Sequence, residues 1–290
     1  MRLVHLSDPH LSSLAAHGLH TLRGKRRLGY LSWLRRRRHQ HRPEVLEALC
    51  EHVRAEQADV IAVTGDLTQL GLPDEIAAAS AWLEGLAPTP VVLVPGNHDL
   101  YRDDARVELA ARWSAQLRVP ALDEQAFPSR LDVGPVSLFG LCSAHAAPFW
   151  SAGGRLGAAQ LERLDAALAA ARGRLRCVLI HHPPLPGQCS ARKALGDASA
   201  LAALLARHGV ELVLHGHLHR NLAQLHRGRT RVLATASASY APEVGRASYR
   251  VFDIAEQAGG WQVDMRLETL AGDGRGAECI ARERWQLVPP

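Results

Sequence analysis

The sequence predicts an α/β protein in which two β-sheets pack face to face and helices cover their outer sides. Three observations lead to this fold class. Up to residue 217, short apolar runs rich in β-branched residues alternate with segments of helical periodicity, which is typical of an α/β chain. Beyond residue 230, strand-like runs follow one another without intervening helices, which predicts an antiparallel sheet or added edge strands. A chain of 290 residues with 47% hydrophobic composition can bury a sizeable core.

The individual elements follow from the spacing of apolar residues. Apolar runs that end in turn residues predict six buried strands, at residues 2–8, 59–66, 90–99, 136–143, 176–184 and 210–217. Apolar residues at helical spacing between these runs predict helices near 43–57, 73–86, 104–117, 157–172 and 195–208. The strand-like runs of the C-terminal part are 230–237, 248–254 and 261–270. No internal repeat or linker divides the chain, so we expect one domain over residues 1–290.

The cysteine pattern and the N-terminal sequence predict a cytoplasmic protein. Five cysteines without a CxxC pair do not make a complete disulfide framework, which favours a reducing compartment. No apolar stretch approaches the ~20 residues needed to cross a bilayer. The first residues, MRLVHLSD, have neither the length nor the flanks of a secretory signal, and they are interpreted as a strand.

Ligand-type residues follow the predicted strands at the points where they end. They are Asp8, His10, Asp66, Asn97, His98, His181, His217 and His219. Because sites in α/β sheets form at the carboxyl ends of the strands, we expect these residues to converge on one cleft. Their donors are oxygens and imidazole nitrogens without a thiolate, a set that suits Mn²⁺, Fe, Zn²⁺ or Co²⁺. This set does not suit a sulfur-rich structural zinc site.

Five short motifs occur in the order DPH (8–10), GD (65–66), GNHD (96–99), HHP (181–183) and GHLH (216–219). Together they resemble the motifs of the calcineurin-like metallophosphoesterases, over about the first three quarters of the chain. Each motif alone is weak, because GD and PGN are common turn sequences, whereas their joint occurrence in order is specific. The resemblance implies a metallophosphoesterase sandwich of two sheets flanked by helices, and a phosphodiesterase or pyrophosphatase activity.

The resemblance also implies two divalent metal ions. One would be held by Asp8, His10, Asp66 and His219, and the other by Asp66, Asn97, His181 and His217, with Asp66 as the bridge. Two cations ~3.5–4 Å apart repel, so a shared carboxylate and a bridging hydroxide are needed to hold them together. The hydroxide would attack phosphorus. His98 would act as the general acid or stabilise the leaving oxygen, and Asp99 would either orient His98 or cap the next turn.

The run VLHGHLHR, at 213–220, places three histidines at alternate positions. Residues two apart in an extended segment share a face, so we expect Gly216 to turn the backbone and to direct His217 and His219 to different metals. His215 matches no ligand of the family and is expected to be buried and hydrogen-bonded behind the site, rather than to be a further ligand.

We do not expect the other polar residues beside these motifs to bind metal. In the family's H-x-P pattern the first histidine is the ligand, which selects His181 over His182. The loop LPGQCSARKALGD, at 185–197, carries Arg192 and Lys193. We expect both to be solvated surface residues, and the alternative is contact with a second phosphate of the substrate.

Basic charge is concentrated in one segment of the chain. The formal net charge is +5, and nine Lys and Arg residues lie between Pro9 and Pro43, where no Asp or Glu occurs, so the rest of the chain is net acidic. Within this basic insert, at about residues 13–42, apolar and aromatic residues recur at helix-like spacing: Leu28, Tyr30, Leu31, Trp33 and Leu34. The segment therefore predicts an amphipathic helix that carries clusters of arginine.

The composition of the insert suggests an anionic partner. Basic and aromatic residues together suit an anionic lipid or a membrane surface, bound through residues 23–42, and hence peripheral association with the inner membrane surface. The alternative is a solvated basic loop whose apolar residues pack on the body of the protein. Nucleic acid is not favoured, because the sequence carries no recognised DNA or RNA recognition module.

Three functional hypotheses follow. The first is hydrolysis of a lipid-linked nucleotide such as UDP-diacylglucosamine, although the best-known branch of those hydrolases has arginine where His98 stands. The second is a soluble cyclic-nucleotide (cAMP-type) phosphodiesterase, because class III cyclic-nucleotide phosphodiesterases share GNHD, HHPP and GHLH. The third is a non-catalytic scaffold, which the complete set of ligands disfavours. The motifs specify the reaction class and carry no signal for the oligomeric state.

Overall fold

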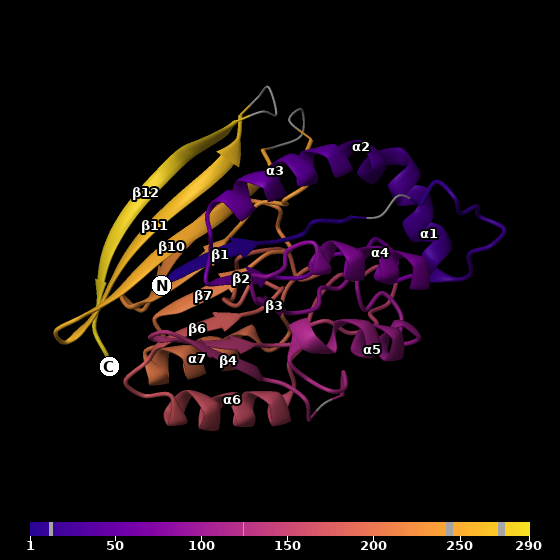
Figure 1. The fold of residues 1–290 in the computed structure, drawn as a ribbon. Coiled ribbons are helices and arrows are strands. Elements are labelled where there is room, and N and C mark those ends of the chain that lie inside the picture. The colour runs from indigo at the N-terminus through magenta and orange to yellow at the C-terminus, as the bar shows by residue number, and fades with distance from the viewer. Residues whose placement is uncertain (12–13, 124, 242–245, 272–275) are drawn as a thin grey trace.

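The structure, a computed structural model, describes residues 1–11, 14–123, 125–241, 246–271 and 276–290. Over these residues two six-stranded sheets pack face to face (Figure 1). In spatial order the first sheet contains β12 (Ala277–Leu287), β11 (Gly260–Leu270), β10 (Ser248–Gln257), β1 (Arg2–Leu6), β2 (Val60–Val63) and β3 (Val91–Leu93). The second contains β4 (Ser129–Val133), β5 (Val136–Gly140), β6 (Leu175–Leu179), β7 (Leu212–His215), β9 (Thr230–Ala234) and β8 (Leu222–His226).

The predicted apolar runs form the parallel part of each sheet. Strands β1, β2 and β3 are parallel to one another, and so are β5, β6, β7 and β9. Every residue of β2, β6 and β7 is buried, as expected for strands that are covered on both faces. Strand β10 pairs antiparallel with β1 and begins a β10–β11–β12 meander, so antiparallel strands extend this edge of the first sheet.

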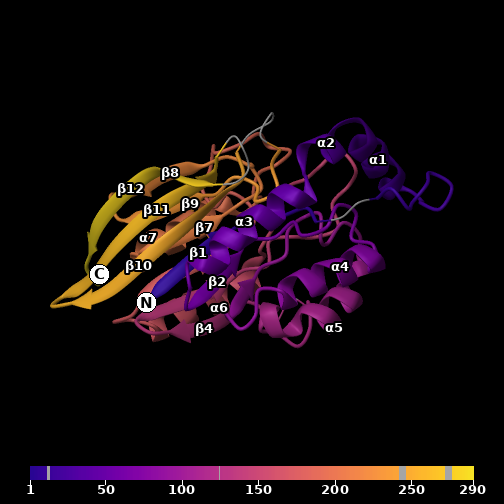
Figure 2. The same cartoon turned by 45° about the horizontal axis from the view of Figure 1, so that its top comes forward.

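Helices cover the outer faces of the two sheets, as the sequence predicts (Figure 2). Helices α3 (Pro43–Ala55), α4 (Pro73–Glu84) and α5 (Ala105–Leu117) pack their apolar sides on the first sheet. Helices α6 (Ala158–Ala170) and α7 (Ala198–His208) cover the second sheet. A third apolar layer between the sheets includes Leu3, Ala62, Leu138 and Leu214. The five predicted helices are thus confirmed, and their ends differ from the predicted ends by a few residues.

The strands that the sequence did not predict all lie at sheet edges. Strands β4 and β8 are the two edges of the second sheet, and β12 is an edge of the first. Most residues of β8 and β12 are exposed, and neither strand has the continuous apolar run that marks a strand buried on both faces. The run at 230–237 also differs from expectation, because β9 lies inside the second sheet, parallel to β7 and antiparallel to β8.

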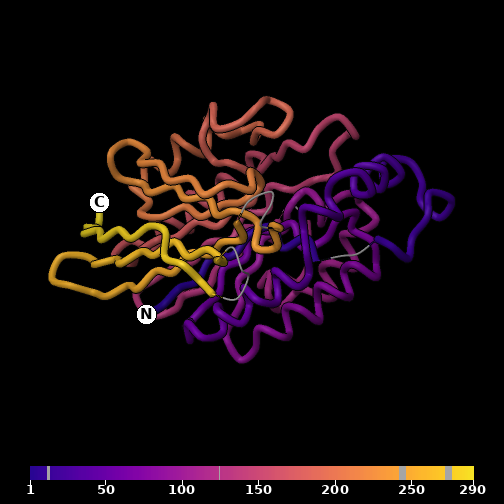
Figure 3. Tube along the Cα trace, turned by 90° about the horizontal axis from the view of Figure 1, so that it is seen from above, coloured from indigo at the N-terminus to yellow at the C-terminus, as the bar shows by residue number. Residues whose placement is uncertain are grey.

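The basic insert is helical from residue 25 to residue 40. Helix α1 (Lys25–Ser32) continues into a π-helical turn, η1 (Trp33–Arg37), and then into α2 (Arg38–Gln40). The insert lies at the end of the molecule opposite the two termini (Figure 3). Residue 13, the first residue of the predicted insert, lies outside the described residues.

The aromatic residues of the insert face the protein. Tyr30 and Trp33 stack with ring centroids 5.6 Å apart and are 8% and 6% exposed. They belong to an apolar cluster with Leu70, Leu72 and Tyr101 of the body. The interpretation of these aromatics as a lipid-facing surface is therefore wrong, because they are already buried against protein. No helix among the described residues is long and apolar enough to cross a membrane.

Replacing Trp33 with Ala is expected to destabilise the insert. Removing a buried Trp side chain costs about 3–5 kcal/mol, and here the loss falls on the local stability of residues 25–40. Amide hydrogen exchange over this segment measures it, with Leu28→Ala as the control because Leu28 is 49% exposed. Unchanged protection in the Trp33→Ala protein would contradict the buried packing.

Candidate metal centre

The ligand-type residues at the predicted strand ends come together at one site. Asp8 and His10 follow β1, Asp66 follows β2, Asn97 follows β3, His181 follows β6, and His217 and His219 follow β7. In the first group the donor atoms of Asp8, His10, Asp66 and His219 lie within 4.8 Å of one another. The Nε2 of His219 is 3.1 Å from Asp8 Oδ1 and 3.3 Å from His10 Nε2.

A second group of donors shares Asp66 with the first. The donor atoms of Asp66, His181 and His217 also lie within 4.8 Å of one another. The Nε2 of His181 is 3.3 Å from Asp66 Oδ2 and 3.2 Å from Asn97 Oδ1. The Nδ1 of His217 is 3.2 Å from the same His181 nitrogen. Metal–ligand bonds are ~2.0–2.2 Å long, so two donors of the same ion lie roughly 3 Å apart. The distances between these donor atoms are of that size.

Three imidazoles are fixed by a contact at the ring nitrogen that faces away from the site. These Nδ1 contacts are Thr68 O for His10 (3.2 Å), Thr64 O for His181 (2.7 Å) and Tyr240 Oη for His219 (3.1 Å). A carbonyl oxygen only accepts hydrogen bonds, so Nδ1 of His10 and of His181 carries the proton. When either ring is neutral, its Nε2 therefore has the lone pair and faces the other donors, which is the tautomer that a metal ligand needs.

The backbone is left-handed at most of these positions. Asp8, His10, Asp66, His217 and His219 have φ values of 51°, 43°, 56°, 68° and 52°. Non-glycine residues in this region are uncommon and cluster at functional sites. The conformation directs successive side chains inward, so that residues of one short loop reach one site.

Two glycines give the space for this arrangement. A Cβ atom on Gly216 would stand 1.8 Å from Ser7 Oγ and 2.4 Å from Asp8 Oδ2, and one on Gly96 would stand 2.2 Å from Asp66 Oδ1. Gly216 was expected to turn the chain. The left-handed residues of the GHLH motif are the two histidines at 217 and 219, so Gly216 is needed for close approach instead.

Asp99 stabilises the loop that carries Asp66. Its carboxylate accepts hydrogen bonds from the backbone N–H groups of Asp66 (2.9 Å), Leu67 (2.8 Å), Thr68 (2.9 Å) and Gly96 (2.9 Å). The His98 Nδ1 meets a different acceptor, Gln69 O, at 2.6 Å. Of the two roles expected for Asp99, the geometry therefore matches the backbone cap and not the orientation of His98. Burial, together with the charge of Asp66, raises the pKa of Asp99 to about 7.

The remaining histidines near the site have other contacts. The Nδ1 of His182 is 2.8 Å from Ser143 Oγ, and its Nε2 is 3.2 Å from Ala152 O, so both ring nitrogens are engaged outside the ligand groups. His215 is fully buried, and its Nδ1 lies 3.2 Å from Gly216 O. Neither residue belongs to the metal-binding groups found among the described residues. This agrees with the structural prediction for both.

A pocket of about 280 Å³ opens over the two groups of donors. Its lining includes site residues together with Arg36, Arg37, Gln40 and His41 of the insert, and Arg192, Lys193 and Tyr240. Arg192 is exposed and Lys193 is partly exposed, in agreement with the solvated roles expected for them, and both also lie at the pocket. The insert is one wall of the site.

Sequence reasoning missed His41 as a residue of the site. It is buried, with its ring centroid 4.3 Å from that of His10, and its Nδ1 lies 2.9 Å from Ser239 Oγ. The backbone of residues 40–42 pairs with residues 239–241, which fixes this end of the insert. The contact joins segments about 200 residues apart, and the only local signal was a histidine next to a basic run.

Asp66 and His181 form a buried electrostatic pair within the site. Burial acts to raise the pKa of Asp66, but His181 and His98 hold that pKa well below its ordinary value. Burial acts to lower the pKa of His181, and the Asp66 carboxylate overcomes this and raises the pKa to about 9. Without a metal, His181 therefore carries a proton near pH 7, which a cation must displace.

Metal affinity is therefore expected to increase with pH. Because His181 must lose a proton, the affinity for Mn²⁺ should increase ~10-fold per pH unit between pH 7 and pH 9 and level off above the His181 pKa. Calorimetric titration at several pH values measures this, and buffers of different ionisation enthalpy count the released proton. A flat profile over this range would show that His181 is already neutral.

The residues present fit a metal centre. Asp8 Oδ1 and His217 Nε2 are buried side-chain atoms that find no hydrogen-bond partner within the described part of the chain. The Asp8 oxygen is the one that lies among the donors of the first group. Leaving such an atom unpaired costs about 1–3 kcal/mol, which coordination of a cation would offset. Carboxylate, amide and imidazole donors without a thiolate agree with the oxygen- and nitrogen-binding metals expected from the sequence.

Comparison with known proteins gives the family. The family model described as calcineurin-like phosphoesterase matches residues 1–221. The chain belongs to the calcineurin-like phosphoesterases. It is therefore a hydrolase, and the family inferred from the five motifs is confirmed.

Individual calcineurin-like phosphoesterases are similar to this chain. The 3',5'-cyclic adenosine monophosphate phosphodiesterase CpdA of Escherichia coli (strain K12) is 32% identical over 250 residues, which cover 82% of this chain and 76% of CpdA. A dimetal phosphatase from Danio rerio has a TM-score of 0.66 at 14% identity, with 98% of both chains covered. Purple acid phosphatase PPD1 of yellow lupin has a TM-score of 0.60 at 14% identity, covering 99% of this chain and 54% of its own. The two solved structures share the fold and confirm the predicted sandwich.

Proposed function

We propose that this calcineurin-like phosphoesterase is a metal-dependent phosphodiesterase that hydrolyses a 3',5'-cyclic nucleotide. The observation that supports it most is the similarity to CpdA over 82% of the chain, together with candidate metal-binding side chains that lie close together at one site. The pocket is small and its lining is mostly charged or polar, which suits a compact anion.

Seven side chains would hold two divalent cations of the Mn, Fe, Zn or Co type. Asp8, His10, Asp66 and His219 would bind one, and Asp66, Asn97, His181 and His217 the other. Asp66 belongs to both groups and would be the bridge. When bound, the two metals supply positive charge to the phosphoryl oxygens and an activated water for attack on phosphorus.

The chain's own residues would position the reacting groups. Water adds to phosphorus, the bond from phosphorus to one ribose oxygen breaks, and a proton passes to that oxygen, which leaves a nucleoside monophosphate. His98 lines the pocket beside Asp66, and its backbone N–H donates to Asp66 Oδ1 at 2.7 Å. His98 is therefore our candidate for contact with the leaving oxygen.

Protonation of His98 limits this role. Burial and the neighbouring Arg37 lower its pKa to about 3, so in the free protein the imidazole is neutral near pH 7. Its Nδ1 proton is donated to Gln69 O. To donate a proton to the leaving oxygen, His98 must first gain one, which a bound anionic diester would favour.

A lipid-linked nucleotide is the competing substrate. That hypothesis required the insert to offer apolar and aromatic residues to a membrane, whereas Tyr30 and Trp33 are buried. The pocket over the donors also offers charged groups where an acyl chain would need apolar ones. These observations favour the cyclic nucleotide.

Substrate comparison with the metal-loaded protein tests the proposal. We expect hydrolysis of cAMP to AMP with a kcat/KM at least ~100-fold above that for UDP-diacylglucosamine, and loss of activity on chelation of the metal. Co-sedimentation with anionic vesicles at low salt serves as the second measurement and should show no binding above background. Preference for the lipid-linked nucleotide, together with vesicle binding, would overturn the proposal.

A further inference from the structure

Two arginines of the insert, Arg26 and Arg37, differ in whether a carboxylate neutralises their charge. The Arg26 guanidinium donates to the carbonyls of Leu70 (3.1 Å) and Gly71 (2.7 Å) and forms a two-bond ion pair with Asp104 (2.8 Å each). Arg26 therefore anchors the insert to the body. Arg37 is half-buried and, among the described residues, forms no ion pair with a carboxylate.

The one polar contact of Arg37 among the described side chains is not a true hydrogen bond. Its Nη1 lies 3.2 Å from His98 Nδ1. That nitrogen is also 2.6 Å from Gln69 O, and a carbonyl oxygen only accepts, so His98 Nδ1 carries a proton. A guanidinium has donors and no acceptor, so two donors face each other here. A guanidinium that is partly withdrawn from water and has no anion beside it gains free energy when an anion binds to it.

The surroundings of Arg37 supply the place for that anion. Arg37 lines the pocket that contains Asp66 and Asn97, and Arg36, Arg192 and Lys193 lie on the same lining. Asp66 is the one carboxylate on this lining within the described part of the chain, and it belongs to both groups of metal donors. With metals bound, the pocket is strongly positive and fits a phosphoryl group.

The fold holds Arg37 in place on both sides. It is the last residue of the π-helical turn, which begins at the buried Trp33. Three residues further on, the backbone of Gln40 accepts a hydrogen bond from Ala241 N at 2.8 Å, and Arg42 N donates to Ser239 O at 2.9 Å. A fixed guanidinium needs little reorganisation to bind an oxyanion.

We propose that Arg37 is a substrate-binding residue, supplied by the insert, which donates hydrogen bonds to a phosphoryl oxygen of the substrate beside His98. The inference deepens the proposed function and rests on it for the identity of the phosphate ester. Arg37 offers two donors to adjacent oxygens, and its charge matches the charge that accumulates on phosphorus oxygens during cleavage.

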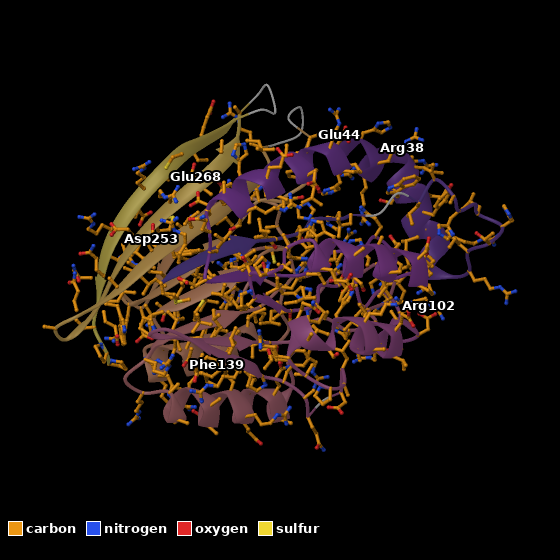
Figure 4. The ribbon with its side chains drawn as sticks, viewed as in Figure 1. Arg38, Glu44, Arg102, Phe139, Asp253 and Glu268 are labelled. Carbon is orange, nitrogen blue, oxygen red and sulfur yellow. The ribbon has the colours of Figure 1, made fainter. Side chains whose placement is uncertain are left out.

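Phosphate binding by the metal-loaded protein tests the proposal without requiring turnover. The variants are Arg37→Gln, Arg37→Lys and, as the matched control, Arg38→Gln, because Arg38 is exposed on the outer surface of the insert (Figure 4). Titration calorimetry measures the Kd for inorganic phosphate, and mass spectrometry measures bound metal. We expect Arg37→Gln to raise Kd by ~10- to 100-fold at unchanged metal content, Arg37→Lys to restore part of the affinity, and Arg38→Gln to stay within about twofold.

Two results would overturn the inference. One is an Arg37→Gln protein that binds metal and phosphate as the wild type does. The other is loss of metal from both Arg37 variants, which would make Arg37 a structural residue. Failure of the proposed function has a different signature: phosphate binding would still depend on Arg37, while cAMP would not be hydrolysed by the wild type.

Discussion

Replacing Asp66 with Asn is expected to abolish hydrolysis and to prevent binding of two metals together. Its Oδ2 is 3.3 Å from His181 Nε2 and 3.9 Å from His10 Nε2, so one carboxylate serves both groups of donors. Asn would keep the Oδ1 that accepts a hydrogen bond from His98 N, so the loop should remain in place. We expect loss of the carboxylate charge to raise the activation free energy by several kcal/mol, which corresponds to a loss of ~10³-fold or more in kcat.

Metal analysis and turnover of bis(p-nitrophenyl) phosphate measure this result. Asp103→Asn is the control, because the Asp103 side chain is 75% exposed and pairs with Arg106 instead of joining either group of donors. The control should retain two metals and full activity. An Asp66→Asn protein with two metals and undiminished turnover would rule out the shared-carboxylate centre.

His98→Ala is expected to lower kcat by roughly 10²- to 10⁴-fold while the metal content stays close to that of the wild type. The side chain lies on the pocket lining and outside the metal-binding groups of the described residues, and its backbone contact with Asp66 is independent of the imidazole. The loss should be largest for ribose leaving groups, which need a proton, and smallest for p-nitrophenolate, which needs little help.

Comparing these two substrates in the wild type and in His98→Ala isolates the leaving-group role. Arg37→Lys serves as the companion variant. It keeps the His98 imidazole and replaces only the neighbouring guanidinium by an ammonium group. An equal loss with both leaving groups would mean that His98 positions the substrate and transfers no proton. Loss of a metal from His98→Ala would make His98 a ligand.

The candidate metal ligands were predictable as a cluster because each follows an apolar strand within a short motif. Asp66 and His181 are far apart in sequence, yet the ends of buried strands are recognisable locally, and such ends meet in an α/β sheet. The role of Asp99 was harder to predict, because an aspartate at the end of the GNHD motif can either orient the catalytic histidine or cap backbone N–H groups. The structure places it on four N–H groups, including that of Asp66.

The insert was predictable as a helix but not as a wall of the site. Its apolar spacing is local, whereas the direction in which Trp33 and Arg37 face depends on packing against Leu70 and Tyr101 and on the pairing of residues 40–42 with 239–241. A basic and aromatic composition is the same for a membrane-binding helix and for a helix that lines an anion pocket. Tertiary contacts distinguish the two.

The left-handed backbone at the candidate metal ligands costs folding free energy at the positions where metal binding is proposed. Each non-glycine residue in that conformation costs of order 1–3 kcal/mol, and five of the seven predicted ligands are in it. At His217, a glycine would relieve this cost and would also remove a candidate ligand, so a substitution that is expected to favour folding is also expected to weaken metal binding. Selection for stability alone would therefore erase the site at these positions, and the rest of the fold must supply the free energy that keeps it.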